Sequence, residues 1–231
     1  PGIVQINAGG VTRNILENLA RMGLDCRLLT AVGRDALGEM ALSSTREAGV
    51  DVSRALRISG EPTSTYCALL EPDGEMLVAL SDMRILERLS DGYLEAQAAL
   101  LCGADAVVLD PSLPERVIDR VLELARSAPV FADPVSTTYA KKLIGRAGRF
   151  HMLKPNRMEL EMLSGMRADT EAALRSASQE LVAKGCRMVY TTLGADGCAY
   201  ADNEGRYIRM KLRPVERMEN ATGAGDAFAA G

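Results

Sequence analysis

Apolar and polar positions along the chain follow two periods, one typical of helices and one typical of strands. From Val11 to Met22 the apolar residues recur every three or four positions, which predicts a helix with one buried face that ends near Gly23. Short apolar runs predict buried strands at 28–32, 105–110, 130–133, 151–153 and 188–192, and helical patterns lie at 36–48, 114–127, 137–147, 156–164 and 169–184. This alternation predicts an α/β fold with a mainly parallel sheet and helices on both faces.

One segment departs from this alternation. Residues 65–71 and 75–80 are strand-like runs joined by Pro72-Asp-Gly, a combination that predicts a β-hairpin. Residues 3–7 are a third run of the same kind, so strands at about 1–8 and 57–81 are expected to form a small antiparallel lid. An ordinary hairpin at the edge of a sheet explains the pattern equally well. Residues 1–231 contain no internal repeat or long linker, and a single domain is expected.

Composition narrows the class of protein. The net charge is −4, and the 27 basic and 31 acidic residues are dispersed, which disfavours a nucleic-acid partner. The apolar runs are too short to cross a membrane, and the first residues lack the regions of a signal peptide. Five scattered cysteines without a Cys-x-x-Cys pair indicate the reducing cytoplasm rather than disulfides or a zinc site. Composition therefore disfavours nucleic-acid and membrane partners.

The strongest candidate for chemistry is the last stretch of the chain, in which Gly223, Ala224 and Gly225 precede Asp226. Small residues admit a ligand close to the backbone, and N–H groups at a helix start bind anions. Asp226 can accept the proton of a hydroxyl group that attacks a phosphate. The chain has neither a Walker sequence nor an early Gly-x-Gly-x-x-Gly, which disfavours a dinucleotide oxidoreductase. Phosphoryl transfer that relies on a helix start and Mg²⁺ fits these residues.

Polar residues also follow the predicted strands, where ligands bind in parallel α/β sheets. Asn156 and Glu159 have the spacing of a capping box, and the same two side chains are candidates to hold Mg²⁺ through its waters. Asp133 is interpreted as a cap of the segment after its strand, and His151, the single histidine, as structural. The other candidates are a turn suited to a polyhydroxyl ligand (Gly9, Gly10 and Asn14) and a strand end suited to a nucleotide (Thr192, Gly194 and Gly197).

In their order along nearly the whole chain, these motifs resemble those of the ribokinase-like carbohydrate kinases, the phosphofructokinase-B family. Residues 32–38 are similar to the family's Gly-x-Asp-x-x-Gly element, Asn156 and Glu159 to its Asn-x-x-Glu motif, and residues 222–226 to its signature. The resemblance implies a three-layer fold with a mainly parallel central sheet and a small antiparallel β lid. It also implies ATP-dependent phosphorylation of an alcohol group on a sugar or nucleoside.

The resemblance assigns a role to each candidate residue. It implies that Asp226 is the catalytic base, and that Gly223, Ala224 and Gly225 form the anion hole. Acceptor binding is implied for Gly9, Gly10 and Asn14, nucleotide binding for Thr192, Gly194, Gly197 and Thr222, and Mg²⁺ binding for Asn156 and Glu159. Asn220 stands where many members have an Asp near a monovalent cation, so dependence on such a cation stays open.

Three segments (9–15, 63–83 and 131–136 with 153–157) are most similar to family members that phosphorylate the 5′-hydroxyl of pseudouridine. The alternatives are a kinase for another nucleoside or a free sugar, such as ribose, adenosine or a keto-sugar, and a non-catalytic nucleoside sensor of the same fold. The family's first strand and its C-terminal adenine-site helices are expected before Pro1 and after Gly231, so the chain is expected to be truncated at both ends. A homodimer through the lid and a cytoplasmic location are also expected.

Overall fold

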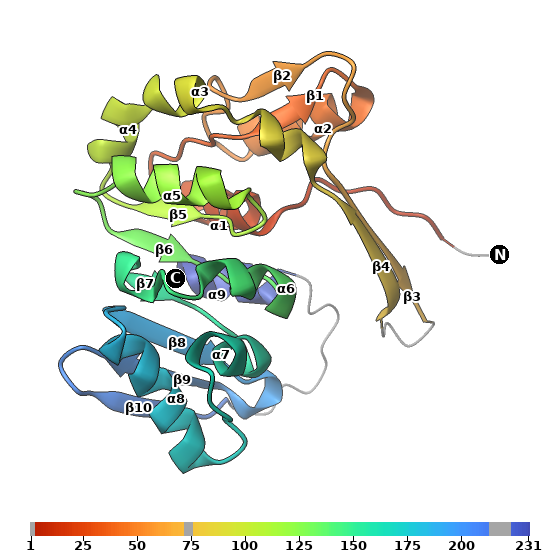
Figure 1. Ribbon diagram of the computed structural model, residues 1–231. Helices are drawn as coiled ribbons and strands as arrows, with labels where there is room; N and C mark the ends of the chain where they lie inside the picture. Colours follow the sequence, from red (N-terminus) through yellow and green to blue (C-terminus); the bar gives the residue numbers. More distant parts are fainter. Residues whose placement is uncertain (1–2, 72–75, 213–222) are drawn as a thin grey trace. The chain divides into compact units, whose positions relative to one another are not determined.

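The computed structural model describes residues 3–71, 76–212 and 223–231. The chain forms two compact units, Pro1–Ser90 and Asp91–Gly231, whose elements are labelled in Figure 1. No helix within the described ranges is both long and apolar enough to cross a membrane.

The first unit contains two small sheets. β1 (Ala31–Gly33) and β2 (Leu56–Ile58) pair in parallel, whereas β3 (Thr65–Leu70) and β4 (Met76–Asp82) form an antiparallel hairpin. The described part of the unit also contains α1 (Val11–Arg21), α2 (Ala36–Glu47) and the 3₁₀ helix Arg84–Arg88. The predicted hairpin is confirmed, and its Pro72-Asp-Gly turn lies outside the described residues.

The expected third lid strand is not formed. Residues 3–7 are in no strand, and Ile3 and Val4 are 90% and 87% exposed. A strand needs a hydrogen-bonded neighbour as well as an apolar pattern, and the described residues of this unit supply none. Likewise, residues 56–58 pair with β1 and not with the hairpin.

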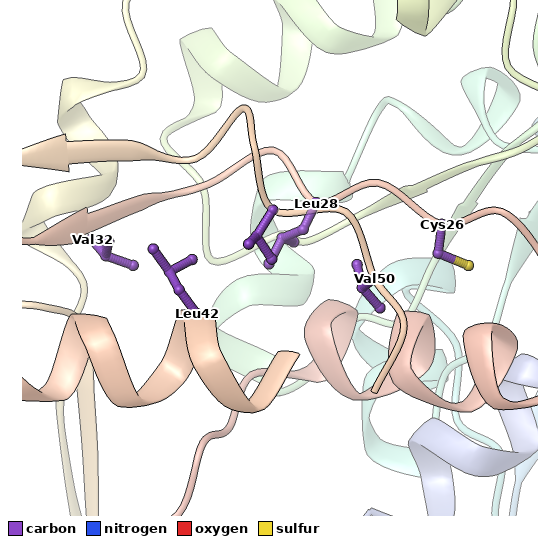
Figure 2. Packing of buried hydrophobic residues seen from close by; sticks show 6 residues of the cluster. Cys26, Leu28, Val32, Leu42 and Val50 are labelled. Carbon is purple, nitrogen blue, oxygen red and sulfur yellow. The ribbon is translucent and has the colours of Figure 1, made fainter. Parts of the chain in front are cut away.

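Buried apolar side chains form a core cluster in the first unit (Figure 2). Leu42 points from α2 toward the extended segment that carries Leu28 and Val32. The buried members of the cluster are Cys26, Leu28, Val32, Leu42, Val50 and Val52, and Leu16, Leu19 and Ala20 of α1 pack against them. Burial of each larger apolar side chain contributes about 1.5–3 kcal/mol, so this cluster holds α1 and α2 on the strand segments.

The Gly-x-Asp-x-x-Gly element joins this core to the base of the hairpin. The Asp35 carboxylate accepts hydrogen bonds from the Gly38 N–H (2.7 Å), the Thr63 N–H (2.8 Å) and the Thr63 hydroxyl (2.6 Å). The hydroxyl bond of Thr63, followed by its N–H bond, lowers the pKa of Asp35. A Cβ at Gly33 would lie 2.4 Å from the Glu61 carbonyl oxygen, so only glycine fits there. Asp35 therefore caps α2 and anchors the segment that enters β3.

A six-stranded sheet forms the centre of the second unit, in the order β10-β9-β8-β7-β6-β5. Four neighbouring strands are parallel: β5 (Val107–Leu109), β6 (Val130–Ala132), β7 (Met152–Leu153) and β8 (Met188–Thr192). β9 (Cys198–Asp202) and β10 (Tyr207–Met210) continue the sheet antiparallel. The helices are α3 (Asp91–Glu95), α4 (Ala98–Cys102), α5 (Glu115–Leu124), α6 (Thr137–Ala140), α7 (Arg157–Ser164), α8 (Glu171–Ala183) and α9 (Ala224–Ala230).

Helices cover both faces of this sheet. The Thr191 hydroxyl of β8 lies 3.5 Å from the Ser178 hydroxyl of α8. The preceding residue, Tyr190, packs edge-on against Phe228 of α9, with 5.9 Å between ring centroids. Successive side chains of a strand point to opposite faces, so α8 and α9 lie on opposite sides of β8. The predicted arrangement of a mainly parallel sheet between helices is confirmed.

Several boundaries differ from the prediction. β8 has the predicted bounds, but β1 begins three residues later than expected. The single helix predicted for 137–147 is wrong: α6 stops at Ala140, the 3₁₀ helix Lys141–Leu143 follows, and Gly145 turns the chain with a φ of +80°. Left-handed backbone at a glycine ends regular helix. β9 and β10 were not predicted at all.

Candidate active site

Charged side chains meet at the carboxyl ends of β6 and β7. Asp133 directly follows β6, and Lys154 directly follows β7. Ala132 and Leu153 are paired in the sheet, so the residues that follow them, Asp133 and Lys154, lie side by side. The Lys154 ammonium is 2.7 Å from Asp133 Oδ2, and these side chains are only 5% and 9% exposed. This is a buried ion pair, whose partners depend on each other because an unpaired charge is costly to bury.

Lys154 also lies against the glycine-rich motif of α9. A Cβ added to Gly225 would be 3.3 Å from the Lys154 amine. Gly223, the N-cap of α9, has a φ of +82°, a conformation that favours glycine. Ala224 begins the helix, and Asp226, in its first turn, is 8% exposed. The buried lysine and the buried acid are thus brought to the same helix start.

Asn156 and Glu159 form the predicted capping box. The Glu159 N–H donates to Asn156 Oδ1 at 2.9 Å, and the Asn156 N–H donates to Glu159 Oε2 at 2.8 Å. Glu159 is only 2% exposed. Burial raises the pKa of Glu159 above its ordinary value of 4.5, the Asn156 N–H lowers it, Asp133 raises it, and Lys154 lowers it. The capping reading is therefore confirmed, and it places a buried carboxyl close to the Asp133–Lys154 pair.

Acidic groups outnumber basic ones at this end of the sheet. Asp133, Glu159 and Asp226 are buried carboxyls, whereas Lys154 is the one buried cation among the described residues of the site. An excess of buried negative charge favours either protonation or a bound cation. The site is therefore electrostatically suited to a positively charged ion or to a metal-bound ligand.

The oxygen atoms of Asn156 and Glu159 fit Mg²⁺ held through water. In the described ranges, no group of three or more His, Cys, Asp or Glu side chains is arranged to hold a metal ion. A cage of protein ligands is thus lacking there, but Mg²⁺ keeps several waters and needs few direct ligands. One amide and one carboxylate, both fixed by the capping box, meet that lesser requirement.

Two glycines of the predicted nucleotide segment have different physical reasons to be glycine. At Gly197, with a φ of +89°, a Cβ would lie 2.2 Å from the Met210 carbonyl oxygen, so close packing of β10 explains the residue. Gly194 has open space around it, so its left-handed φ of +60°, and not close packing, favours glycine there. Thr192 is held by its N–H, which donates to the Pro155 carbonyl at 2.9 Å. Thr222 and Asn220 lie outside the described residues.

The predicted acceptor residues meet at the start of α1, within the first unit. Gly10 is the N-cap of α1 with a φ of +111°, and its carbonyl accepts the Asn14 N–H at 2.8 Å. Asn14 Oδ1 accepts a hydrogen bond from Arg13 Nη1 at 3.0 Å. Gly9 is exposed, with no atom near its missing Cβ. Gly9, Gly10 and Asn14 therefore form one local turn.

The sequence analysis missed the partnership of Asp133 and Lys154. Asp133 does cap its own turn, since its Oδ1 accepts the Val135 N–H at 2.9 Å, but its other oxygen binds Lys154. Val135 has a φ of +66°, a strained value for a β-branched residue. The strain is local to the turn that fixes Asp133. Equivalent positions after two neighbouring parallel strands were the signal that could have paired them.

Comparisons with known proteins agree with this architecture. The model of the pfkB family of carbohydrate kinases matches residues 2–231. Pseudouridine kinase from Escherichia coli strain K12 is 37% identical over 232 residues, which cover 100% of this chain and 74% of that protein. A Clostridium perfringens protein described as a sugar kinase has a TM-score of 0.85 at 32% identity, covering 100% of this chain and 72% of that one.

A third relative shows the fold. Ribokinase from Arabidopsis thaliana, solved with ribose and ATP, has a TM-score of 0.83 at 24% identity, covering 98% of this chain and 73% of that one. The fold is ribokinase-like, as the motifs led us to expect. Since the family model spans almost the whole chain, the protein belongs to the pfkB family of carbohydrate kinases, phosphotransferases that act on a sugar or nucleoside hydroxyl.

Proposed function

We propose that the chain transfers the γ-phosphoryl group of ATP to the 5′-hydroxyl of pseudouridine, with Asp226 as general base. The main support for the reaction type is that Asp226 is buried and directly follows Gly225. Gly225 itself lies against the Lys154 amine. The choice of acceptor rests on the 37% identity with pseudouridine kinase. Another nucleoside or a free sugar is the second candidate, because a protein described as a sugar kinase is 32% identical.

The start of α9 supplies the groups that the transfer needs. Asp226 accepts the proton of the acceptor hydroxyl while the oxygen of that hydroxyl attacks the γ-phosphorus of ATP. The bond between the γ-phosphorus and the β-phosphate oxygen then breaks, and ADP leaves. The first N–H groups of a helix have no intrahelical carbonyl partner, so those of Gly223, Ala224 and Gly225 are suited to bind the transferring group. A buried cation beside this helix start adds to the stabilisation of negative charge. Lys154 is that cation, and Asp133 orients it.

The nucleotide is proposed to lie along Thr192, Gly194, Gly197 and Thr222. The ribokinase solved with ATP supports a nucleotide site in this fold. Asn156 and Glu159 are proposed to hold Mg²⁺ through its waters. When bound, the ion neutralises charge on the phosphates. The capping box fixes both oxygen-bearing side chains before any ion arrives.

The acceptor is proposed to bind at Gly9, Gly10 and Asn14. The family match, which runs from residue 2 to residue 231, includes these residues. The exposed backbone of Gly9 and the amide of Asn14 offer hydrogen-bonding groups to sugar hydroxyls.

We further propose a cytoplasmic homodimer through the hairpin. Its exposed apolar side chains are Tyr66, Leu69, Leu70, Leu77, Val78 and Leu80. Leu69, Val78 and Leu80 lie on one face of the hairpin, and a monomer rarely leaves a contiguous apolar patch uncovered. Leu80, which is 72% exposed, is the natural site for a test: Leu80→Lys should convert the dimer to a monomer in sedimentation equilibrium. An unchanged mass would rule out the hairpin as the interface.

The proposed reaction is tested by measuring ADP release from the intact protein with ATP, Mg²⁺ and a panel of acceptors. Pseudouridine, uridine, adenosine, guanosine, ribose and fructose separate nucleosides from free sugars. The highest kcat/KM is expected with pseudouridine, and the product should carry its phosphate on the 5′ oxygen. Faster turnover of a free sugar would replace the acceptor but keep the reaction type.

The same panel separates a kinase from a sensor. A non-catalytic sensor would bind a nucleoside in calorimetry without releasing ADP with any acceptor. That outcome would reject the kinase proposal, because a buried carboxylate at the start of α9 would then have no reaction to serve.

A further inference from the structure

A groove lies at the amino ends of β6, β7 and β8. The Asp133–Lys154 pair lies at the opposite, carboxyl ends of these strands. Its volume is about 560 Å³. The residues that line it precede or begin these strands: Arg126, Ser127, Ala128, Pro129, Val130, Gly148, Arg149, Phe150, His151, Gly185 and Arg187. A strand rises about 3.3 Å per residue, so the amino and carboxyl ends of β8, five residues long, are about 16 Å apart. The groove is therefore distinct from the candidate active site within the second unit.

The charges that line the groove have one sign. Arg126, Arg149 and Arg187 are exposed, and no acidic residue belongs to the lining set. Among the described residues, no carboxylate forms a salt bridge with any of the three. Arg146, only three positions before Arg149, instead binds Asp119 through two hydrogen bonds of 2.6 and 2.8 Å. Asp119 also interacts electrostatically with Arg149, whereas Arg126 and Arg187 have no carboxylate in salt-bridge contact within the described ranges.

The floor of the groove is closely packed and partly apolar. Phe150 is buried, and a Cβ on Gly185 would lie 2.8 Å from the Gly148 Cα, so two backbone segments pack directly on each other. His151 stacks near Phe131, with ring centroids 5.4 Å apart. Burial, followed by the charge of Arg187, lowers the pKa of His151, which leaves the imidazole neutral at physiological pH. A neutral imidazole still donates one N–H to an anion.

We propose that this groove binds a small phosphorylated anion through Arg126, Arg149 and Arg187. Guanidinium groups match phosphate oxygens with paired hydrogen bonds. Pockets of about 300–1,000 Å³ accommodate small organic ligands, so the groove admits a phosphate ester or a diphosphate with its organic group on the apolar floor. A nucleic-acid backbone shares this chemistry, but the chain's net charge of −4 disfavours a polyanion.

His151 is a built-in reporter of this site. It is the one histidine of the chain, and His151→Gln identifies its resonance in a tag-free intact protein. An anion bound between Arg187 and the imidazole should raise the His151 pKa in an NMR titration. The probes are inorganic phosphate and pyrophosphate, each compared with potassium chloride at the same ionic strength. We expect a saturable rise with pyrophosphate, a weaker one with phosphate and a small, non-saturating one with chloride.

Variants show which side chains bind the probe. Removal of one charged donor should weaken pyrophosphate binding about tenfold, so Arg126→Gln and Arg187→Gln should both shift the saturation point. Arg167→Gln is the matched control, because Arg167 is exposed and pairs with Asp169 away from the groove lining. It should leave the titration unchanged. A pyrophosphate curve that equals the chloride curve, or that survives both groove variants, would overturn the proposal. Saturation by a short RNA at lower concentration than pyrophosphate would overturn the small-anion assignment.

Discussion

The carboxyl ends and the amino ends of the parallel strands in the second unit carry charge in opposite ways. At the carboxyl ends, called here the carboxyl edge, Asp133, Lys154 and Glu159 are each less than 10% exposed, and the lysine contacts an acid. At the amino ends, called here the amino edge, Arg126 and Arg187 are exposed and have no carboxylate in salt-bridge contact among the described residues. The same parallel strands connect these two sets of charged residues.

Burial explains the difference. A charge removed from water must be paired, because its desolvation costs several kcal/mol. An exposed guanidinium keeps its hydration, so it needs no protein partner. The carboxyl edge therefore couples charge to folding stability, whereas the amino edge holds charge that is available to a ligand. The following variants test that contrast, from the largest expected effect to the smallest.

Asp226→Asn is expected to have the largest effect. A general base contributes about 10²–10⁴-fold to rate, and Asn keeps the shape of the side chain but cannot take the proton. The turnover number for ADP release should therefore fall by about that factor, while acceptor binding in calorimetry stays within about threefold.

Asp169→Asn is the matched control, because Asp169 is an exposed acid of the same unit. Turnover should be unchanged in that variant. Near-normal turnover of Asp226→Asn would remove Asp226 from the base role and would leave the carboxyl edge without its proposed catalyst.

Lys154→Met should cause the largest loss of stability. Removing one partner of a buried ion pair costs about 3–5 kcal/mol because the other charge stays buried and unpaired. Here that charge is Asp133, 9% exposed in its side chain. The free energy of unfolding in urea should fall by this amount.

A second substitution separates charge from packing. In Lys154→Met with Asp133→Asn, the amide still accepts the Val135 N–H while the unpaired charge is gone, so at least half of the loss should be recovered. Arg167→Met, at an exposed pair, should cost less than about 1 kcal/mol. A cost that small for Lys154→Met would contradict the buried pair.

Glu159 should make stability depend on pH in a direction opposite to most acids. Its pKa is raised above the ordinary 4.5, so the folded state holds the proton more tightly than the unfolded state. Its stabilising contribution is therefore complete below the ordinary pKa and is lost as pH rises through the raised value. Glu159→Gln should remove this loss, so its unfolding free energy relative to wild type should increase from pH 4 to pH 8. A difference that stays constant over that range would contradict the raised pKa.

Local chemistry was predictable from sequence, whereas contact across the sheet was not. The capping box of Asn156 and Glu159 needs only a spacing of three residues, and it was predicted. The contact of Asp133 with Lys154 needs two strands in a particular register, with Ala132 opposite Leu153, and the apolar runs specify no register. The groove arginines carry no motif, since they gather only when three strand starts are brought side by side.

The same distinction explains the fold. The bounds of β8 were predicted because its five residues favour a strand; buried and half-buried positions alternate along it. The alternation in residues 3–7 looked equally strand-like, yet no neighbouring strand pairs with it within the described part of its unit. β10 is a short edge strand with half-buried and exposed residues in turn, a pattern too brief to stand out from loops.

Arg126→Gln should have the smallest effect, and its sign distinguishes the two edges. A paired structural arginine would lose stability on this change, as Lys154 does at the carboxyl edge. Three like charges around one groove repel one another, so removal of one should leave the free energy of unfolding within about 0.5 kcal/mol or raise it. Salt screens such repulsion over about 10 Å at 0.1 M. Any gain over wild type should therefore disappear as sodium chloride rises from 10 mM to 500 mM in urea unfolding. A loss above about 1 kcal/mol at every salt concentration would mean that Arg126 holds the fold together, and the amino edge would then carry no spare charge for an anion.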